Sequence, residues 1–238
     1  LSEQLSGGKE MGQVLHDCLE LIDASSYLKD GKAHFLAAED IQEVARNAVL
    51  KHQVSIDEID TILALVWNVL NTRFKLSDSI TLPPLGTMEV LKEMEFLYPY
   101  PSGLSSDRGY VRGFIDGLFI HDGKYYWLDW KSDRLDDYQD TAIASHVQSH
   151  YGIQAQLYTL ALTRLLRIEN KSDYERRVGG LMYVYLRGVD GTDAPSNRGL
   201  FFMRPEFEAT QQFESEWAQR GLYDPPELEI DVIGGELE

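Results

Sequence analysis

The segment 113–133, GFIDGLFIHDGKYYWLDWKSD, constrains the fold of this chain more than any other part of its sequence. Two runs of β-branched, aromatic and aliphatic residues flank the tetrapeptide HDGK at 121–124, and an Asp-Gly pair in that position favours a tight hairpin turn. Charged residues interrupt both runs, with Asp116 in the first and Asp129 and Lys131 in the second. Buried charges are stable only when they are paired or bind a metal. The segment therefore predicts a β-hairpin that encloses charged groups among apolar side chains.

The spacing of these charges predicts their relative placement. Asp129 and Lys131 are two residues apart on one strand, so both side chains leave the same face of the sheet. The turn brings Asp116 back beside Asp129, and a divalent cation would relieve the repulsion between the two carboxylates. Oxygen ligands of this kind suit Mg²⁺, which retains several waters and leaves positions for a phosphate. The alternative from spacing alone is a structural Asp–Lys ion pair that closes the hairpin.

Apolar residues at helical spacing predict helices through the first 80 residues, ending at Pro83 and Pro84. One apolar stripe begins at Met11 and a second at Ile41. A capping-box pattern of Ser55 and Glu58 precedes a third stripe. These patterns indicate an α-helical N-terminal extension.

From residue 87 the chain changes to short apolar segments separated by turn signals. We expect strands at 88–98, 110–121 and 124–131, helices over 141–167 with a break near Gly152, a doubly covered strand at 180–188, a strand near 199–204 and a helix near 206–220. This order predicts an α/β fold with a mixed central sheet flanked by helices. We divide the chain into a helical N-terminal part at 1–86, a core at 87–224 and an acidic tail at 225–238 without fixed structure.

Charge and composition limit the classes of function. The formal net charge is −17, whereas dedicated DNA-binding domains are usually basic because phosphate contacts dominate their affinity. Tight autonomous DNA binding is therefore not expected, although local cations and bound metals can reverse the field at one site. The alternative is that the acidity only keeps the surface soluble. A single cysteine, Cys18, excludes an internal disulfide and a cysteine-bound iron–sulfur cluster, and fits the cytoplasm.

Other sequence signals are absent. No apolar run approaches the roughly 20 residues of a membrane span, so no membrane association is expected. The first ten residues, LSEQLSGGKE, lack the basic and apolar parts of a secretory signal, and the missing initiator methionine favours a fragment of a longer chain. The G-x-x-x-x-G-K-[ST] motif does not occur, so no P-loop motor is expected within this sequence.

Four motifs in the second half resemble a known nuclease family in both order and spacing. They are GFIDGLF at 113–119, YYWLDWKS at 125–132, YGIQAQLYTLAL at 151–162 and GLMYVYLRGVD at 180–190. This series is similar to the C-terminal nuclease domains of the RecB family, the β subunits of exodeoxyribonuclease V, within the PD-(D/E)xK superfamily. It covers most of residues 109–205. The resemblance implies a restriction-endonuclease-like core and metal-dependent hydrolysis of phosphodiester bonds.

The resemblance also implies roles for individual residues. Asp116 and Asp129 match the metal-binding aspartates, and Lys131 matches the catalytic lysine. The backbone carbonyl of Trp130 stands where the family offers a further metal ligand. Ile115 precedes Asp116 at the position where the superfamily's name gives proline. The loss of this proline is common in such sites, so the resemblance stands.

A weaker match lies in the N-terminal helix. The run GQVLHDCLE at 12–20 resembles the family's G-x-x-x-H segment, which makes His16 a candidate metal ligand. The helix pattern by itself is equally compatible with a surface histidine. Gly12 lies one turn before His16 and is expected to leave space for metal or DNA.

Two further motifs suggest auxiliary residues. In KEMEF at 92–96, Glu93 aligns best with the family's glutamate, while Glu95 would share its strand face; a solvated strand edge is the alternative. Gln154 and Tyr158 match a Q-x-x-x-Y motif that implies phosphate contacts, and an amphipathic helix explains the same spacing. Three arginines are further candidates for phosphate contacts without a distinguishing signal: Arg112, Arg134 and Arg187.

The expected function is that of a Mg²⁺-dependent DNA exonuclease domain. Mn²⁺ is expected to substitute for Mg²⁺, and Ca²⁺ to bind without supporting turnover. The resemblance implies DNA as substrate and, as partners, the helicase and other subunits of a RecBCD-type complex in recombinational repair of double-strand breaks. Two alternatives stay open: a nuclease-fold domain that only docks other proteins, and a nuclease that acts on RNA or branched DNA.

Overall fold

The computed structural model describes residues 5–100, 109–219 and 231–234 of the chain. The chain divides into two compact units. Unit 1 comprises Leu1–Val90, Asp129–Ser145 and Met182–Phe202, and unit 2 comprises Leu91–Leu128, His146–Leu181 and Met203–Glu238. The first segment of unit 1 ends at Val90, and the division expected at residue 87 stays a prediction. Two later segments of the chain also belong to unit 1.

The strands form a mixed sheet in the order β1-β2-β3-β4-β5, with β6 paired to β2. Their bounds are β1 Val90–Tyr100, β2 Gly109–His121, β3 Lys124–Lys131, β4 Val178–Tyr185, β5 Leu200–Met203 and β6 Asp231–Gly234. Every residue of β4 is buried, as expected for a doubly covered strand. The predicted α/β fold with a mixed sheet and N-terminal helices is therefore confirmed.

The predicted hairpin is the pair β2–β3. These strands pair antiparallel from Gly117↔Leu128 to His121↔Lys124. The two turn residues, Asp122 and Gly123, have φ of +48° and +74°. Positive φ at both central positions is typical of a two-residue turn whose twist matches the strands. The Asp-Gly pair thus determines the register, because glycine adopts this conformation without a steric penalty and aspartate tolerates it.

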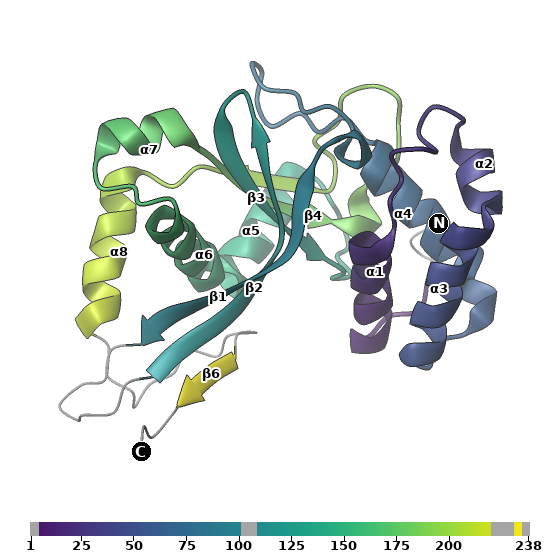
Figure 1. Ribbon diagram of the computed structural model, residues 1–238, viewed down its shortest axis with the longest axis horizontal. Helices are drawn as coiled ribbons and strands as arrows, with labels where there is room; N and C mark the ends of the chain where they lie inside the picture. Colours follow the sequence, from purple (N-terminus) through teal and green to yellow (C-terminus); the bar gives the residue numbers. More distant parts are fainter. Residues whose placement is uncertain (1–4, 101–108, 220–230, 235–238) are drawn as a thin grey trace. The chain divides into compact units, whose positions relative to one another are not determined.

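Four helices dominate unit 1 and lie together in one cluster (Figure 1). They are α1 Lys9–Leu21, α2 Lys32–Ala37, α3 Glu39–Lys51 and α4 Ile59–Asn71. Helix α1 packs on α3 and α4, and α2 packs on the same two helices. Nearly all of α4 is buried, and Trp67 on it lies with its ring 5.2 Å from that of Phe35. Burial of these stripes explains why the apolar periodicity predicted the helices correctly.

The predicted capping box before α4 is wrong. Ser55 instead caps the short 3₁₀ turn η1, Ile56–Glu58, where its Oγ accepts a hydrogen bond from the Asp57 amide at 3.3 Å. The Glu58 carboxylate accepts a hydrogen bond from the Ser6 amide at 2.8 Å. Because the 3₁₀ turn precedes α4, Glu58 is the N-cap residue of α4 and is not at its third position.

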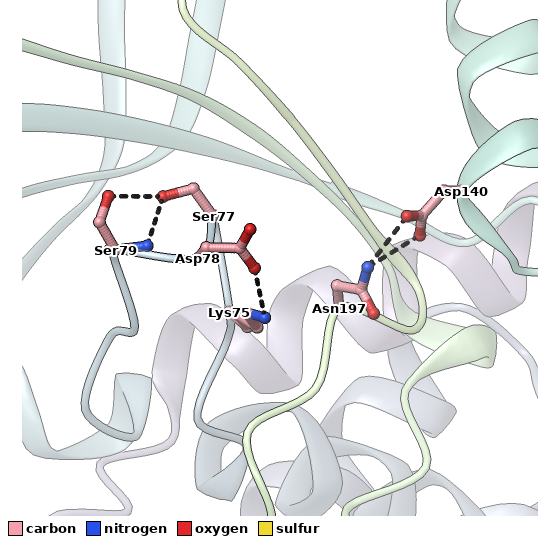
Figure 2. A network of polar contacts seen from close by, with 6 residues as sticks. All are labelled: Lys75, Ser77, Asp78, Ser79, Asp140 and Asn197. Carbon is pink, nitrogen blue, oxygen red and sulfur yellow. Dashed lines mark hydrogen bonds and ion pairs between the residues drawn. The ribbon is translucent and has the colours of Figure 1, made fainter.

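Polar contacts join separate segments of unit 1 after α4. Phe74 forms an isolated parallel β-bridge with Ser196, and the Lys75 amide donates a hydrogen bond to the Ser196 carbonyl at 3.0 Å. The neighbouring Asn197 donates its side-chain amide to both carboxylate oxygens of Asp140, at 3.1 and 3.0 Å, as Figure 2 shows. In the loop that follows α4, the Lys75 Nζ forms an ion pair with Oδ1 of Asp78 at 2.8 Å (Figure 2). These contacts explain how residues before 90 and after 182 form one compact unit.

The described residues of unit 2 contain three further helices, and α8 packs on both of the others. They are α6 Gly152–Leu165, α7 Lys171–Arg177 and α8 Phe207–Gln219. Helix α5, Asp140–His150, ends just before α6, which confirms the predicted break near Gly152. Sequence periodicity did not predict α7, a helix of seven residues whose N-cap Asn170 accepts a hydrogen bond from the Asp173 amide at 2.9 Å.

The acidic tail differs from expectation in one segment. Residues 231–234 form β6, which pairs antiparallel with the start of β2 from Gly109↔Gly234 to Arg112↔Asp231. Val232 and Ile233 are β-branched and favour a strand once an unpaired strand edge is available. The expectation that the tail lacks structure is thus wrong for these four residues; 225–230 and 235–238 lie outside the described ranges. Among the described helices, none is long and apolar enough to cross a membrane.

Candidate metal centre

The end of β3 in unit 1 carries the predicted D-x-K residues. Asp129 and Lys131 are 4% and 5% exposed, and the Lys131 Nζ lies 2.7 Å from Oδ2 of Asp129. The Lys131 Nζ also lies 5.0 Å from the ring centroid of Tyr183 on β4. The two charged side chains therefore share one strand face, as the alternation of the strand predicted.

His16 on α1 reaches the same strand end. Its Nε2 donates a hydrogen bond to the backbone carbonyl of Trp130 at 3.1 Å, across 114 residues of sequence. Burial lowers the pKa of His16 and outweighs the opposing effect of the Asp129 carboxylate, while the Lys131 ammonium lowers it further. A lowered pKa keeps the imidazole neutral near neutral pH, which is the form that binds metals.

Gly12 differs from expectation. A Cβ at this position would lie 2.7 Å from the Oγ of Ser132, so the space beside Gly12 is filled by the residue that follows Lys131. The prediction that Gly12 leaves open space for metal or DNA is therefore wrong, because α1 packs directly on the end of β3 here.

Two arginines that the sequence offered as phosphate contacts bind backbone carbonyls within unit 1. Arg187, which is 5% exposed, donates to the carbonyls of Ser132 at 3.0 Å and Ser6 at 2.6 Å. Arg134 donates to the Leu5 carbonyl at 3.0 Å. Both guanidinium groups therefore hold the N-terminal segment in place, and Arg187 also holds the residue after Lys131.

Unit 2 brings together the other predicted acidic residues. Asp116 on β2 is 8% exposed, and one of its carboxylate oxygens lies within 4.8 Å of one of Glu93 on β1. The backbone φ of Glu93 is +51°, a conformation that costs roughly 1–3 kcal/mol outside glycine and gathers at functional sites. Glu95 is exposed and pairs with Arg112 at 2.6 Å. These observations favour Glu93 over Glu95 as the motif glutamate.

Gln154 and Tyr158 on α6 contact each other. The Gln154 Nε2 donates to the Tyr158 hydroxyl at 3.1 Å, and both residues are buried, at 6% and 3% exposure. The Tyr158 ring also meets Phe96 edge-on, with centroids 5.3 Å apart. Their contact with DNA phosphates stays a prediction, since the amide and the phenol form a buried hydrogen bond.

The hairpin register relates the two predicted metal-binding aspartates. Gly117 pairs with Leu128 within unit 2. Asp116 precedes Gly117 and Asp129 follows Leu128, so both aspartates adjoin the same pair along the chain. The placement of the two carboxylates side by side stays a prediction.

The donor atoms suit a small divalent cation. Taken by itself, unit 2 offers the carboxylates of Glu93 and Asp116. Taken by itself, unit 1 offers the Asp129 carboxylate, the Trp130 carbonyl and the His16 imidazole. The oxygen-rich set fits Mg²⁺, and the imidazole also suits Mn²⁺.

Sequence reasoning missed the residues that support this strand end. Tyr183 and Tyr185 are two apart on β4 and fully buried, and the apolar run concealed their spacing. Burial, aided by the Asp133 and Asp129 carboxylates, raises the pKa of Tyr185, so its phenol stays protonated. The same alternation that revealed Asp129 and Lys131 marks the two tyrosines as sharing one face.

Comparison with known proteins gives the family. The family model of the PD-(D/E)XK nuclease superfamily matches residues 1–228. RecBCD enzyme subunit RecB of Escherichia coli (strain K12) is 46% identical over 104 residues, which cover 41% of this chain and 9% of that protein. Its counterpart from Haemophilus influenzae is 29% identical over 240 residues, covering 88% of this chain and 18% of the relative.

A relative with a different name is also similar. An ATP-dependent helicase/nuclease subunit of Streptococcus pneumoniae (strain Hungary19A-6) is 26% identical over 167 residues, covering 70% of this chain and 12% of that protein. The chain thus spans less than a fifth of the length of each of these three relatives. Since the family match includes both the N-terminal helices and the β2–β3 hairpin, this chain belongs to the PD-(D/E)XK nuclease superfamily.

Proposed function

We propose that this chain is a Mg²⁺-dependent DNA exonuclease domain of the exodeoxyribonuclease V type. The observation that carries the proposal is the approach of the His16 Nε2 to the Trp130 carbonyl, at 3.1 Å, between the buried residues Asp129 and Lys131. A neutral imidazole, a backbone carbonyl and a carboxylate at one strand end form a ligand set that a structural ion pair alone does not require.

Each residue has a distinct proposed role. Asp116, Asp129, the Trp130 carbonyl and His16 would be the residues that hold the metal, and Glu93 would orient the attacking water. When bound, Mg²⁺ lowers the pKa of a coordinated water and offsets charge on the phosphate. Lys131 lies beside Asp129, with 2.7 Å between its Nζ and Oδ2, and would either stabilise the charge that builds on the phosphate or help to deprotonate the attacking water.

The acidic surface supports a role within a larger assembly. With a net charge of −17, the chain has little long-range attraction for the DNA backbone. Two of its relatives are named as RecB of the RecBCD enzyme, and a third is named as part of a helicase/nuclease. We propose that helicase and partner subunits of a RecBCD-type complex deliver the DNA strand, in recombinational repair of double-strand breaks. Gln154 and Tyr158 would contact that strand.

Cleavage assays with defined metals test the activity. End-labelled linear single-stranded DNA, duplex DNA and RNA are each incubated with the chain in Mg²⁺, Mn²⁺, Ca²⁺ or excess chelator. We expect nucleotides to be released from DNA ends with Mg²⁺ or Mn²⁺ and very little product with Ca²⁺, whose looser coordination positions water poorly. Cleavage in excess chelator, cleavage of RNA alone, or no cleavage with any metal would contradict the proposal.

A binding measurement tests the proposed delivery by partners. In Ca²⁺, which limits cleavage, we expect the chain alone to bind DNA with a dissociation constant above about 1 µM at physiological salt, weakening further as salt rises. Fluorescence anisotropy with labelled single-stranded and duplex DNA provides the affinities. Nanomolar binding at physiological salt would show that the chain needs no partner to hold its substrate.

A further inference from the structure

Strand β1 stands at the end of the strand order, so among the described residues no strand pairs with its outer edge. None of its residues from 90 to 99 is buried, and Leu91 and Leu97 are 57% and 58% exposed. A long strand edge that presents apolar side chains pairs readily with another strand unless something covers it. The outer edge of β1 is therefore a surface that needs an explanation.

The usual protection of such an edge is weak here. Charged residues and proline normally prevent an edge from pairing with a foreign strand. Between residues 94 and 98 the only charged residue is Glu95, and the Arg112 Nε of β2 lies 2.6 Å from its Oε1. Pro99 limits the edge, because it has no amide hydrogen and its carbonyl accepts a hydrogen bond from the Trp217 indole at 3.3 Å. Residues 94–98 are thus the part of β1 whose backbone can pair with an added strand.

A groove of about 590 Å³ lies beside this edge, within unit 2. It is lined by residues 94–99 of β1, by three residues of α6 and by one of α8: Ala161, Arg164, Leu165 and Glu214. Consecutive residues of a strand point to opposite faces, so a groove that touches all of them borders the edge of the strand. Leu165 is 59% exposed and, like Leu97, gives the groove an apolar wall.

The backbone and the lining together indicate the form of the ligand. An α-helix satisfies its own backbone groups, whereas an extended segment needs partners of the kind that a strand edge offers. The polar side chains of the groove already bind one another: Arg164 forms an ion pair with Glu214, and the Tyr98 hydroxyl donates to the same carboxylate at 3.0 Å. Apolar side chains of an extended segment therefore match the surface that remains, which is that of Leu97 and Leu165.

The charge of the chain indicates the character of that segment. A net charge of −17 repels a second copy of the chain and the phosphates of DNA. The same charge attracts a basic segment and speeds its encounter with the chain. Because side chains alternate along a strand, basic residues can face the solvent while apolar residues enter the groove.

We propose that residues 94–98 of β1 and the adjoining groove bind an extended segment of another protein, in which apolar residues alternate with basic ones. The segment adds a strand to the sheet. Hydrogen bonds with the β1 backbone hold it in register, and its apolar side chains lie against Leu97 and Leu165. This inference goes beyond the proposed function and does not depend on DNA cleavage.

A labelled octapeptide that alternates valine and lysine tests the surface. Fluorescence anisotropy at physiological salt gives its affinity for the chain. A block peptide of the same composition has the same charge, so it measures unspecific attraction to an acidic protein. We expect the alternating peptide to bind at least about tenfold more tightly, because only its valines lie on one face of a strand.

Methylation of the peptide backbone tests strand addition directly. In a strand, the amides of alternate residues point to opposite edges. One peptide is methylated at the valine amides and a second at the lysine amides, so each loses the donors of one edge only. We expect one of the two to lose about tenfold in affinity and the other to bind within about twofold of the parent peptide.

Substitutions in the chain locate the binding site. Leu97→Lys removes an apolar contact and places a charge in the groove, and we expect it to weaken the alternating peptide by about tenfold or more. Leu97 is more than half exposed, so the variant is expected to fold; Leu165→Lys is a second substitution in the same groove. Leu50→Lys is the matched control, since Leu50 is 62% exposed on α3 in unit 1 and the change of charge is identical.

The contrary outcomes are distinct. Equal binding of the alternating and block peptides, or equal binding by Leu97→Lys and Leu50→Lys, would overturn the proposal. Loss of binding by both methylated peptides, or by neither, would exclude strand addition. A dimer in sedimentation that Leu97→Lys dissociates would assign the edge to a second copy of the chain instead. If the peptide binds as expected while the chain cleaves no DNA, the docking surface stands and the proposed nuclease activity fails.

Discussion

Asp129→Asn is expected to reduce metal-dependent DNA cleavage by roughly 10³-fold or more, the largest effect of any single substitution considered. The substitution keeps the shape of the side chain and removes the charge that is proposed to hold Mg²⁺. Single-turnover cleavage of end-labelled DNA at saturating Mg²⁺ measures the loss. Cleavage within tenfold of wild type would refute the assignment of Asp129 as a metal ligand.

A structural ion pair would also make Asp129→Asn harmful, so stability has to be separated from chemistry. Asp129 and Lys131 pair at 2.7 Å with side chains 6% exposed, and losing one member of a buried pair costs roughly 3 kcal/mol. Replacing both members by neutral residues avoids leaving one buried charge without its partner. We expect Asp129→Asn/Lys131→Met to regain most of the unfolding free energy in urea titrations while cleavage stays absent. Recovery of cleavage together with stability would show that the pair is only structural.

His16→Ala is expected to produce the second-largest effect, a loss of about 10²-fold in Mg²⁺-supported cleavage. The imidazole approaches the Trp130 carbonyl at 3.1 Å, and its lowered pKa leaves it neutral and able to bind metal. Mn²⁺ accepts nitrogen ligands more readily than Mg²⁺ does, so the loss should be larger when Mn²⁺ is supplied. Titrating each metal in the cleavage assay gives both losses.

His34→Ala is the matched control for this substitution. His34 is exposed on α2, also in unit 1, and has no proposed part in the centre. We expect His34→Ala to cleave as the wild type does with either metal. Equal losses in Mg²⁺ and Mn²⁺ for His16→Ala would point to a role in packing α1 and would remove His16 from the ligand set.

Local structure followed from the sequence because short-range forces determine it. The Asp-Gly pair at 122–123 specifies the hairpin turn, and helical spacing of apolar residues placed the helices of unit 1. The alternation of β3 placed Asp129 and Lys131 on one face before their pairing was known. Elements with weak periodicity escaped prediction, as the seven-residue α7 and the four-residue β6 show.

The candidate site was predictable only in part. Spacing alone left a structural ion pair and a metal site as alternatives, and the family motifs identified Asp116, Asp129 and Lys131 as a group. The sequence favoured Glu93 over Glu95 only through its alignment with the family's glutamate, because a regular strand would place both on one face. The positive φ of Glu93 and the pairing of Glu95 with Arg112 distinguish them, and both depend on the folded strand.

The sequence by itself therefore determined the strongly periodic elements, the hairpin register and the shared strand face of Asp129 and Lys131, since neighbouring residues specify these through sterics and burial. Tertiary structure alone decided which distant groups meet. The contact of His16 with the Trp130 carbonyl spans 114 residues, and that of Arg187 with Ser6 spans 181. No local pattern specifies such separations, because the packing of whole helices and strands sets them. Gly12 shows the consequence. Its position one turn before His16 predicted open space, and the packing of α1 on Ser132 filled that space.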